Sequence, residues 1–507
     1  MSLIHIMFTH YTVSGLSNKE KTVVGGIGSE SATEPLAPRL FTRVTWLIWL
    51  MSVGVLALYV GGVSLPAVEG FVAADGLTVV MWSLVTFMSA VIQSYSRRYM
   101  SGNRRSSRFF AYVFGFTVAV LVLVAAESLV LFVVAWLAMG VVMAELVGFV
   151  RGWKQARASA RLARRSFFLS TTLVSVGFVL LWSETGATTV SELVTSVGSV
   201  SLSIYYVAVL CLLGAAVVQS ALVPFHGWLL SSMTAPTPAS ALMHAGFVNA
   251  GGVLLARFAS VFSESLAVMT TVVVVGALSA VAGKLMKSVR PDIKGKLGCS
   301  TTGQMGFMVM QAGLGFFSAA VTHLILHAFY KAYMFMSACD RVEQTAPDRW
   351  KGGDVGVSGV VVAAVVGTAG GLFFVALTGK GGVGDVGIIL TLLVVLTAGH
   401  ATVTVVGSPA TFAAKAVAPF VFLVAVAVYA VVYNFVTAVI STGTPFSVAE
   451  ATALTPVHVA VAAVFVAAYV GIEFGYVRRS RRLYVKLLNA SQPEHDTVTT
   501  RKEEYDV

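Results

Sequence analysis

The stretch from Pro224 to Phe258, PFHGWLLSSMTAPTPASALMHAGFVNAGGVLLARF, decides the fold because it places polar and ionisable side chains inside a strongly apolar chain. The 507 residues are 57% hydrophobic and only 11% charged, whereas soluble domains carry roughly 25% charged residues. Pro236 and Pro238 of the APTP turn remove backbone donors and break regular helix within a membrane-embedded region. Because broken helices hold the sites of transporters, this stretch indicates a site for moving ions.

The hydropathy pattern predicts an all-α, polytopic membrane protein with broken helices. Apolar runs recur along nearly the whole chain, and about 12–14 of them are long enough to cross a hydrocarbon core of about 30 Å as helices. No alternating ten-residue pattern of a membrane β-barrel is present. We expect three parts: a polar extension over residues 1–42, a transmembrane domain over residues 43–476, and a basic, then polar, cytoplasmic tail over residues 477–507.

The net charge of +11 orients the protein in the membrane. The basic residues cluster at helix ends and in short loops, and they form no basic stripe with stacking aromatic residues, so no nucleic-acid partner is expected. By the positive-inside rule these loops face the cytoplasm, and we expect a multi-pass protein of the cell membrane. The clusters are Arg97/Arg98, Arg104 to Arg108, Arg151 to Arg165, Lys284 to Lys296 and Arg478 to Lys486.

The sequence carries no sign of a cofactor of its own. Cys211, Cys299 and Cys339 are scattered without a CxxC pair, so neither a disulfide framework nor an iron–sulfur or zinc site is predicted. Nucleotide-binding glycine motifs are missing as well. We therefore expect a transporter subunit and not an enzyme, with any redox or nucleotide chemistry in a partner.

Three ionisable residues lie four residues apart in AAVTHLILHAFYKAYMF: His323, His327 and Lys331. On an α-helix they share one face over about 12 Å. Ionisable groups in a membrane span are costly and usually functional, and histidine and desolvated lysine can exchange protons near neutral pH. The alternatives are hydrogen bonding of the histidines to neighbouring helices, with the lysine reaching the interface, and a metal site, which lacks a nearby carboxylate or cysteine.

Two further histidines flank the APTP turn. His244 is the better relay residue, with Asn249 as a neutral hydrogen-bonding partner, whereas His226, Pro236 and Pro238 are expected to form a helix break or gate. The alternative is a simple connecting loop in which the prolines only end a helix.

Other charged residues complete the set of relay residues. Lys284 lies deeper in its apolar run than Lys287, which we expect to reach the cytoplasmic interface. Glu127 and Glu145 are predicted buried acids, and Glu145 is included in the relay. Asp75 precedes a long apolar run, where an acid suits a helix N-terminus.

These motifs resemble a known superfamily, the antiporter-like membrane subunits shared by respiratory complex I and Mrp-type cation/proton antiporters. The matching segments are Pro224 to Arg257, Asp292 to Met308 (DIKGKLGCSTTGQMGFM) and Thr322 to Phe335, with a weaker likeness from Asp75 to Met100. Within the superfamily the chain is most similar to the DabB-type subunits of two-component inorganic carbon transporters. The features that carry this likeness are APTPASALMHAGFVNAGG, AWLAMGVVMAELVGF with the basic RGWKQARASARLARRSFFLS, the tail RLYVKLLNASQPEHDTVTT, and the lack of a lateral helix after Arg482.

The resemblance carries over some site residues and not others. In the proton-pumping relatives a buried glutamate would fall at Leu137 and a buried lysine at Gln219, and both charges are absent here. Their joint loss is physically consistent, because one member alone would be an uncompensated buried charge costing about 3–5 kcal/mol. Glu145, eight residues or about 12 Å beyond Leu137 along the same helix, is a candidate substitute. The residues that match the polar axis of the family are His244, His323, His327 and Lys331.

The resemblance implies a subunit that conducts cations, H⁺ or alternatively Na⁺, and thereby drives a cytoplasmic partner in taking up CO₂ or bicarbonate. The implied partner is a large soluble DabA-type protein with a zinc site like that of carbonic anhydrase. Three alternatives remain: a subunit of an NADH–quinone oxidoreductase, an Mrp-type antiporter subunit, and a membrane anchor that only docks an enzyme.

Overall fold

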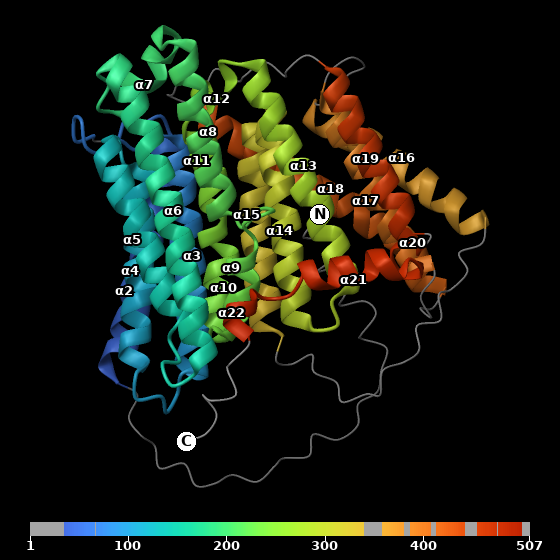
Figure 1. Cartoon of the computed structure of the whole chain (residues 1–507), viewed down its shortest axis with the longest axis horizontal. Helices are drawn as coiled ribbons and strands as arrows, with labels where there is room; N and C mark the ends of the chain where they lie inside the picture. Colours follow the sequence, from blue (N-terminus) through green and yellow to red (C-terminus); the bar gives the residue numbers. More distant parts are fainter. Residues whose placement is uncertain are drawn as a thin grey trace.

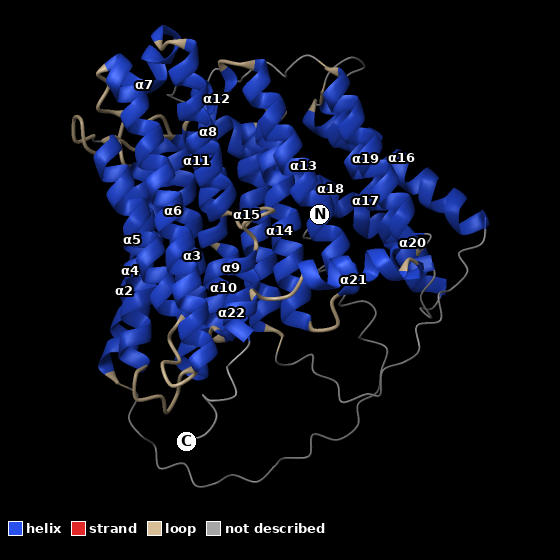
Figure 2. Cartoon of the chain, in the orientation of Figure 1, coloured by secondary structure: helices blue, strands red, loops and turns tan. Residues whose placement is uncertain are grey.

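The computed structural model describes residues 35–65, 67–338, 357–379, 386–406, 412–441, 454–473 and 475–498. Within these ranges the chain is almost entirely helical and has no β-strand, and its long helices stand side by side (Figure 1, Figure 2). Ten helices of this part are long and apolar enough to cross a membrane. The predicted all-α, multi-pass fold class is therefore confirmed.

The long helices alternate with short ones that cap, break or cross the bundle. The long helices are α2 (Leu36–Val60), α3 (Gly76–Tyr99), α4 (Ser106–Ala125), α5 (Leu129–Val147), α6 (Lys154–Thr185), α8 (Leu202–Gln219), α13 (Leu266–Val289), α14 (Ile293–Gly313), α15 (Phe317–Met336), α16 (Val357–Thr378), α17 (Gly387–Val406), α18 (Phe412–Ser441) and α19 (Pro456–Glu473). The short helices are α7 (Val190–Ser196), α9 (Gly227–Ser231), α10 (Thr237–Ala245), α11 (Ala250–Arg257), α12 (Ala259–Ser263), α20 (Tyr476–Arg479), α21 (Arg481–Ala490) and α22 (His495–Val498).

Two hydrophobic cores meet along α14 and α15. The larger core joins α3–α6, α8, α10 and α11, and the smaller core joins α16–α19. Both α14 and α15 contribute side chains to each core, for example Met308 and Leu324 to the larger and Met310 and Ala319 to the smaller. The ionisable face of α15 therefore lies where the two halves of the bundle join.

The segment after α9 is interrupted twice. Pro236 caps α10 and Pro238 occupies its first turn, where a missing N–H is tolerated. The helix ends again at Gly246 (φ −122°, ψ −66°), and a 3₁₀ turn over Phe247–Asn249 leads into α11. Pro236 and Pro238 thus break the helix as predicted, and a second break directly follows His244.

Glycines let α13 and α14 approach closely. A Cβ atom on Gly283 would collide with the backbone of Gly303, and one on Gly306 would lie 2.5 Å from the amide nitrogen of Ala280. Small residues at such contacts are the usual means of packing membrane helices. This contact fixes the position of α14, the helix that packs against α15 and its histidines.

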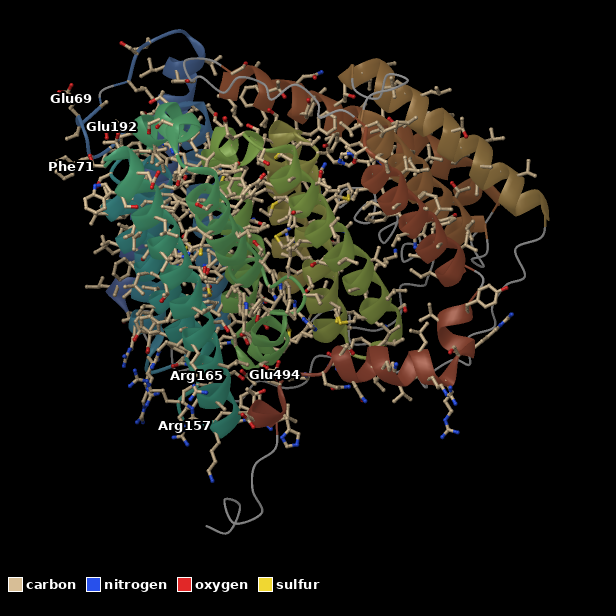
Figure 3. The ribbon with its side chains drawn as sticks, turned by 45° about the horizontal axis from the view of Figure 1, so that its top comes forward. Glu69, Phe71, Arg157, Arg165, Glu192 and Glu494 are labelled. Carbon is tan, nitrogen blue, oxygen red and sulfur yellow. The ribbon has the colours of Figure 1, made fainter. Side chains whose placement is uncertain are left out.

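The two ends of the bundle differ in the charge of their side chains. Figure 3 places Glu69 and Glu192 at one end and Arg157 and Arg165 at the other, so that we name these the acidic and basic ends. By the positive-inside rule we expect the basic end to face the cytoplasm.

A buried cluster of charged side chains lies at the acidic end. Arg257, at the end of α11, forms an ion pair with Asp75 and a second one with Glu127, at 3.5 Å. Asp75 also caps α3 by accepting the Thr78 amide at 2.9 Å, and Glu127 accepts the Ser191 amide at 2.8 Å. The cluster therefore ties α3, α7 and α11 together.

The C-terminal segment, residues 480–498, corrects the expectation that no lateral helix follows Arg482. Its helix α21 crosses the basic end at an angle to the long helices (Figure 1). At the end of α21 the Ala490 carbonyl lies 3.0 Å from His226 Nε2, and beyond the helix the Glu494 amide donates to Ser231 Oγ at 3.0 Å. The charged residues of RRLYVKLLNA favour a polar tail, whereas the helical alternation of its charged and apolar residues indicates a helix.

Several predicted features lie outside the described residues, among them Cys339 and residues 1–34 of the N-terminal extension. Helix α2 begins at Leu36, so it includes the last residues that were assigned to the extension.

Replacing Arg257 should destabilise the protein strongly, because Arg257→Ala leaves the buried carboxylates of Asp75 and Glu127 without their counter-charge. We expect a loss of about 3–5 kcal/mol in the free energy of unfolding, measured by thermal unfolding in detergent. The control is Arg165→Ala, an exposed residue, for which a change below about 0.5 kcal/mol is expected. Equal losses in the two variants would contradict a structural role for the cluster.

Candidate functional site

Helix α15 carries the ionisable row that the sequence predicts. His323, His327 and Lys331 are all buried, and Lys331 has no exposed surface. Helix α14 starts beside the basic loop at Arg290, and α15 runs back antiparallel to it after a short turn. Lys331 therefore lies nearest the basic end and His323 nearest the acidic end.

A backbone carbonyl joins Lys331 to His244 across three helices. The Leu297 carbonyl of α14 accepts a hydrogen bond from Lys331 Nζ at 2.8 Å and another from Thr301 Oγ1 at 3.0 Å. The Thr301 hydroxyl in turn lies 2.9 Å from Nδ1 of His244 on α10. The structure thus brings His244 together with the α15 row, and we call His244, His323, His327 and Lys331 the polar axis.

This network assigns the tautomer of His244. The Thr301 hydroxyl gives its proton to the Leu297 carbonyl, so it accepts the hydrogen bond from His244 Nδ1–H. The other ring nitrogen, Nε2, then carries a lone pair, and it is buried without a hydrogen-bond partner. The ring also stacks on Phe335 with centroids 4.4 Å apart. His244 is held in place on one side and open to protonation on the other.

The two α15 histidines also keep free ring nitrogens. Neither nitrogen of His327 has a hydrogen-bond partner, and Nε2 of His323 has none. Their rings are nearly parallel, with centroids 6.1 Å apart. Such a gap is too long for direct proton transfer and is of a size that one water molecule can bridge.

The structure places Lys284 and Lys287 differently from the prediction. Lys284 is exposed on α13, whereas Lys287 is partly buried and lies within electrostatic range of Lys331. Lys287, which was expected at the interface, is therefore the α13 lysine nearer to the polar axis. Depth along a helix does not reveal which side of the helix faces the neighbouring helices.

Glu145 and His226 lie apart from the polar axis. Glu145 forms ion pairs with Arg164 at 2.8 Å and Arg151 at 3.6 Å near the basic end. His226 is held by the C-terminal segment. Asn249 donates to the Ala245 carbonyl at 2.7 Å and does not bond His244.

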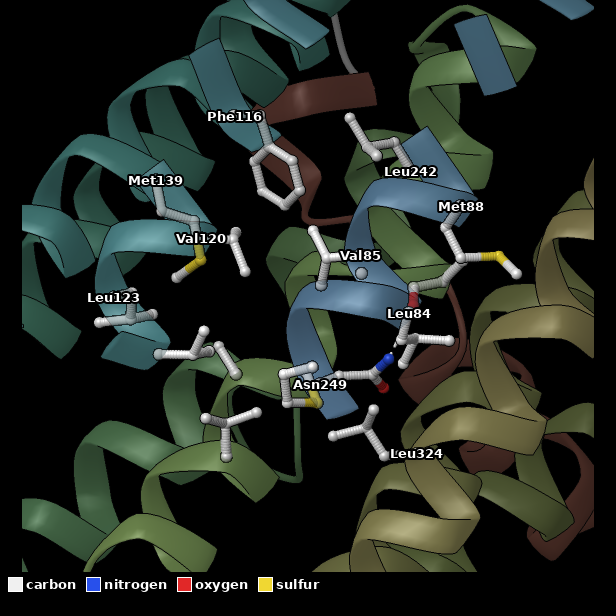
Figure 4. Close-up of a pocket in the computed structure, with 16 residues that line it drawn as sticks. Leu84, Val85, Met88, Phe116, Val120, Leu123, Met139, Leu242, Asn249 and Leu324 are labelled. Atoms are coloured by element: carbon white, nitrogen blue, oxygen red, sulfur yellow. Dashed lines mark hydrogen bonds between the residues drawn. The ribbon is translucent and has the colours of Figure 1, made fainter. Parts of the chain in front are cut away.

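The positions of the two missing charges hold neutral residues. Gln219 is fully buried, and neither its amide oxygen nor its amide nitrogen has a hydrogen-bond partner; Leu137 is half-buried. In the same half of the bundle lies a cavity of about 30 Å³ whose lining is apolar except for Asn249 (Figure 4).

The chemistry of the polar axis suits protons. It consists of nitrogen bases in a row with unpartnered lone pairs, buried from bulk water. Among the described residues, no group of three or more histidine, cysteine or acidic side chains could hold a metal ion. The sequence did not reveal Thr301 or the Leu297 carbonyl, since a threonine in a polar helix is common and a carbonyl leaves no sequence signal.

Two family models and several curated proteins match parts of this chain. The family described as "NADH:quinone oxidoreductase/Mrp antiporter, TM" matches residues 126–350, and "NADH-Ubiquinone oxidoreductase (complex I), chain 5 N-terminus" matches residues 70–110. The probable inorganic carbon transporter subunit DabB1 of Halothiobacillus neapolitanus is 36% identical over 55% of this chain and 51% of its own. NADH-quinone oxidoreductase subunit L of Pseudomonas aeruginosa is 34% identical over 52% of this chain and 44% of its own.

A solved structure shares the fold. The Mrp complex from Dietzia sp. has a chain that matches 91% of this one with a TM-score of 0.56 and 23% identity, over 51% of its own length. Over residues 70–110 and 126–350 the chain therefore matches the antiporter-like membrane subunits of complex I and Mrp antiporters. Its matched part is homologous to the DabB subunits of inorganic carbon transporters. It spans about half the length of the curated relatives it matches.

The threonine pair on α14 allows a matched test of the network. In Thr301→Val the Nδ1–H of His244 loses its acceptor inside the protein, and we expect a loss of about 1–3 kcal/mol in the free energy of unfolding. Thr302→Val removes a hydroxyl that is equally buried and has no partner, so it should be neutral or stabilising. Thermal unfolding of both variants in detergent checks this, and equal effects would refute the hydrogen bond to His244.

Proposed function

We propose that this protein conducts protons along the polar axis and thereby supplies the energy for inorganic carbon uptake by a larger complex. The single observation that carries the proposal is the buried row of Lys331, His244, His327 and His323, with free lone pairs on each histidine. Ionisable groups of this cost in a membrane mark ion pathways. The shared Leu297 carbonyl holds Lys331 and His244 in fixed positions near the basic end.

The partner in this proposal is a large soluble zinc protein of the DabA type, which would hydrate CO₂ to bicarbonate as carbonic anhydrase does. A charge that crosses 100 mV releases about 2.3 kcal/mol, which biases a coupled reaction more than tenfold in one direction. This chain would carry the ion flow, and the partner would carry the catalysis. The exposed arginines of the basic end face the side on which such a partner lies.

A second candidate function is that of a complex I or Mrp-type antiporter subunit. NADH-quinone oxidoreductase subunit L supports this second function, because it is 34% identical to this chain and DabB1 is 36% identical. Two observations favour the carbon transporter: the match covers a larger share of the DabB1 chain, and the charges of the pump at Leu137 and Gln219 are both replaced by neutral residues.

Lys331→Met should abolish proton flow while leaving the protein folded. The change conserves volume and removes a buried charge, so stability should be unchanged or higher. We expect proton flux into proteoliposomes of the purified complex to fall about 100-fold or more, the usual contribution of a proton-transfer group. Lys486→Met, at an exposed position of α21, is the control. A membrane anchor would keep the same behaviour in both variants.

Gentle purification from the native membrane identifies the partner. We expect one large soluble protein to copurify, and a metal assay of the complex should find zinc bound to it. Mass spectrometry of the preparation identifies the proteins that copurify. Several small membrane subunits, or flavin and iron–sulfur proteins, would instead place the chain in an antiporter or a respiratory complex.

A further inference from the structure

A second cavity lies beyond His323, on the side away from Lys331. It has a volume of about 70 Å³ and is enclosed by α14, α15, α16, α17 and α18. Its polar side chains are His323, Gln311, Thr397 and Tyr429, and the rest of its lining is apolar. It therefore extends the polar axis from the larger core into the smaller one.

Two polar atoms of this cavity lack partners in the protein. Nε2 of His323 and Oε1 of Gln311 are buried without a hydrogen bond, and only 5% and 2% of these residues are exposed. Tyr429 of α18 lies within hydrogen-bonding reach of the Gln311 side chain. Buried polar atoms in native proteins are nearly always paired, and ordered water supplies the partner where protein does not.

The volume fits this requirement. A water molecule needs roughly 10–15 Å³ of such space, so the cavity has room for about five to seven. The cavity at Asn249 is smaller and has one polar side chain, whose Oδ1 also lacks a partner. Water is therefore expected next to His323, where the cavity is larger and has more polar side chains.

The same lining discriminates between cations. A hard cation such as Na⁺ prefers oxygen ligands with negative charge. The oxygen atoms of the lining, on Gln311, Thr397 and Tyr429, are neutral, and no carboxylate is present to balance the charge of Na⁺. The histidines and Lys331 offer nitrogen atoms or a positive charge. A proton needs only lone pairs and bridging water molecules.

We propose that the cavity beside His323 is a water-filled outlet of the polar axis, bounded by Gln311 and Tyr429, and that it passes protons and not Na⁺. The proposal rests on the proposed function, because it extends the same axis and names its ion. Gln311 acts here as a positioning residue that orients the water next to His323.

The test compares variants of the full complex in proteoliposomes. Gln311→Leu removes the unpartnered Oε1, and Ala425→Leu fills the cavity without touching a polar group, since Ala425 lines it. Ala430→Leu adds the same volume to the same helix at a buried position outside the lining. We expect proton flux to fall at least about tenfold in the first two variants and less than about twofold in the third.

Two further measurements separate the possible failures. Proton flux should be the same with Na⁺ present or replaced by choline, and a high-resolution map of the complex should show water density between His323 and Gln311. Flux that needs Na⁺, a dry cavity, or equal flux in the three variants would overturn the outlet. If Lys331→Met alone stops the flux, the proposed function stands without this outlet; if Lys331→Met has no effect, the proposed function itself fails.

Discussion

The Leu297 carbonyl is the interaction on which the polar axis depends. A lysine without exposed surface must find an acceptor inside the protein, because lipid offers none. That acceptor is a carbonyl in the second turn of α14, which also receives the hydroxyl that positions His244. The close glycine contact between α13 and α14 holds this carbonyl in place. Helix packing and site chemistry therefore share one structural element.

The two halves of the bundle differ in the polarity of their interior side chains. In the first half, the positions of the pump charges hold Leu137 and Gln219, and the cavity nearby is apolar. Towards the second half, the polar atoms of His323 and Gln311 face a larger cavity with further hydroxyl groups. A pathway that uses α15 is therefore expected to continue towards α17 and α18 and not back through α5.

Much of this arrangement follows from local sequence. Hydropathy predicts the bundle, the four-residue spacing predicts the shared face of His323, His327 and Lys331, and the two prolines predict the first helix break. Contacts between distant segments could not be predicted in this way. Arg257 meets Asp75 across 182 residues, and His244 meets Thr301 across 57. The exposure of Lys284 depends on the rotation of α13 against its neighbours, which its own sequence does not determine.

The C-terminal segment has a consequence for biosynthesis. Residues 480–498 leave the ribosome after every helix to which they bind, and their hydrogen bonds reach back to His226, Ser231 and Arg290. The loop before α10 is therefore covered only once α19 has been inserted and the chain has returned to the basic end. A chain that stops early in synthesis would keep this loop uncovered, and so would differ at its surface from a finished one.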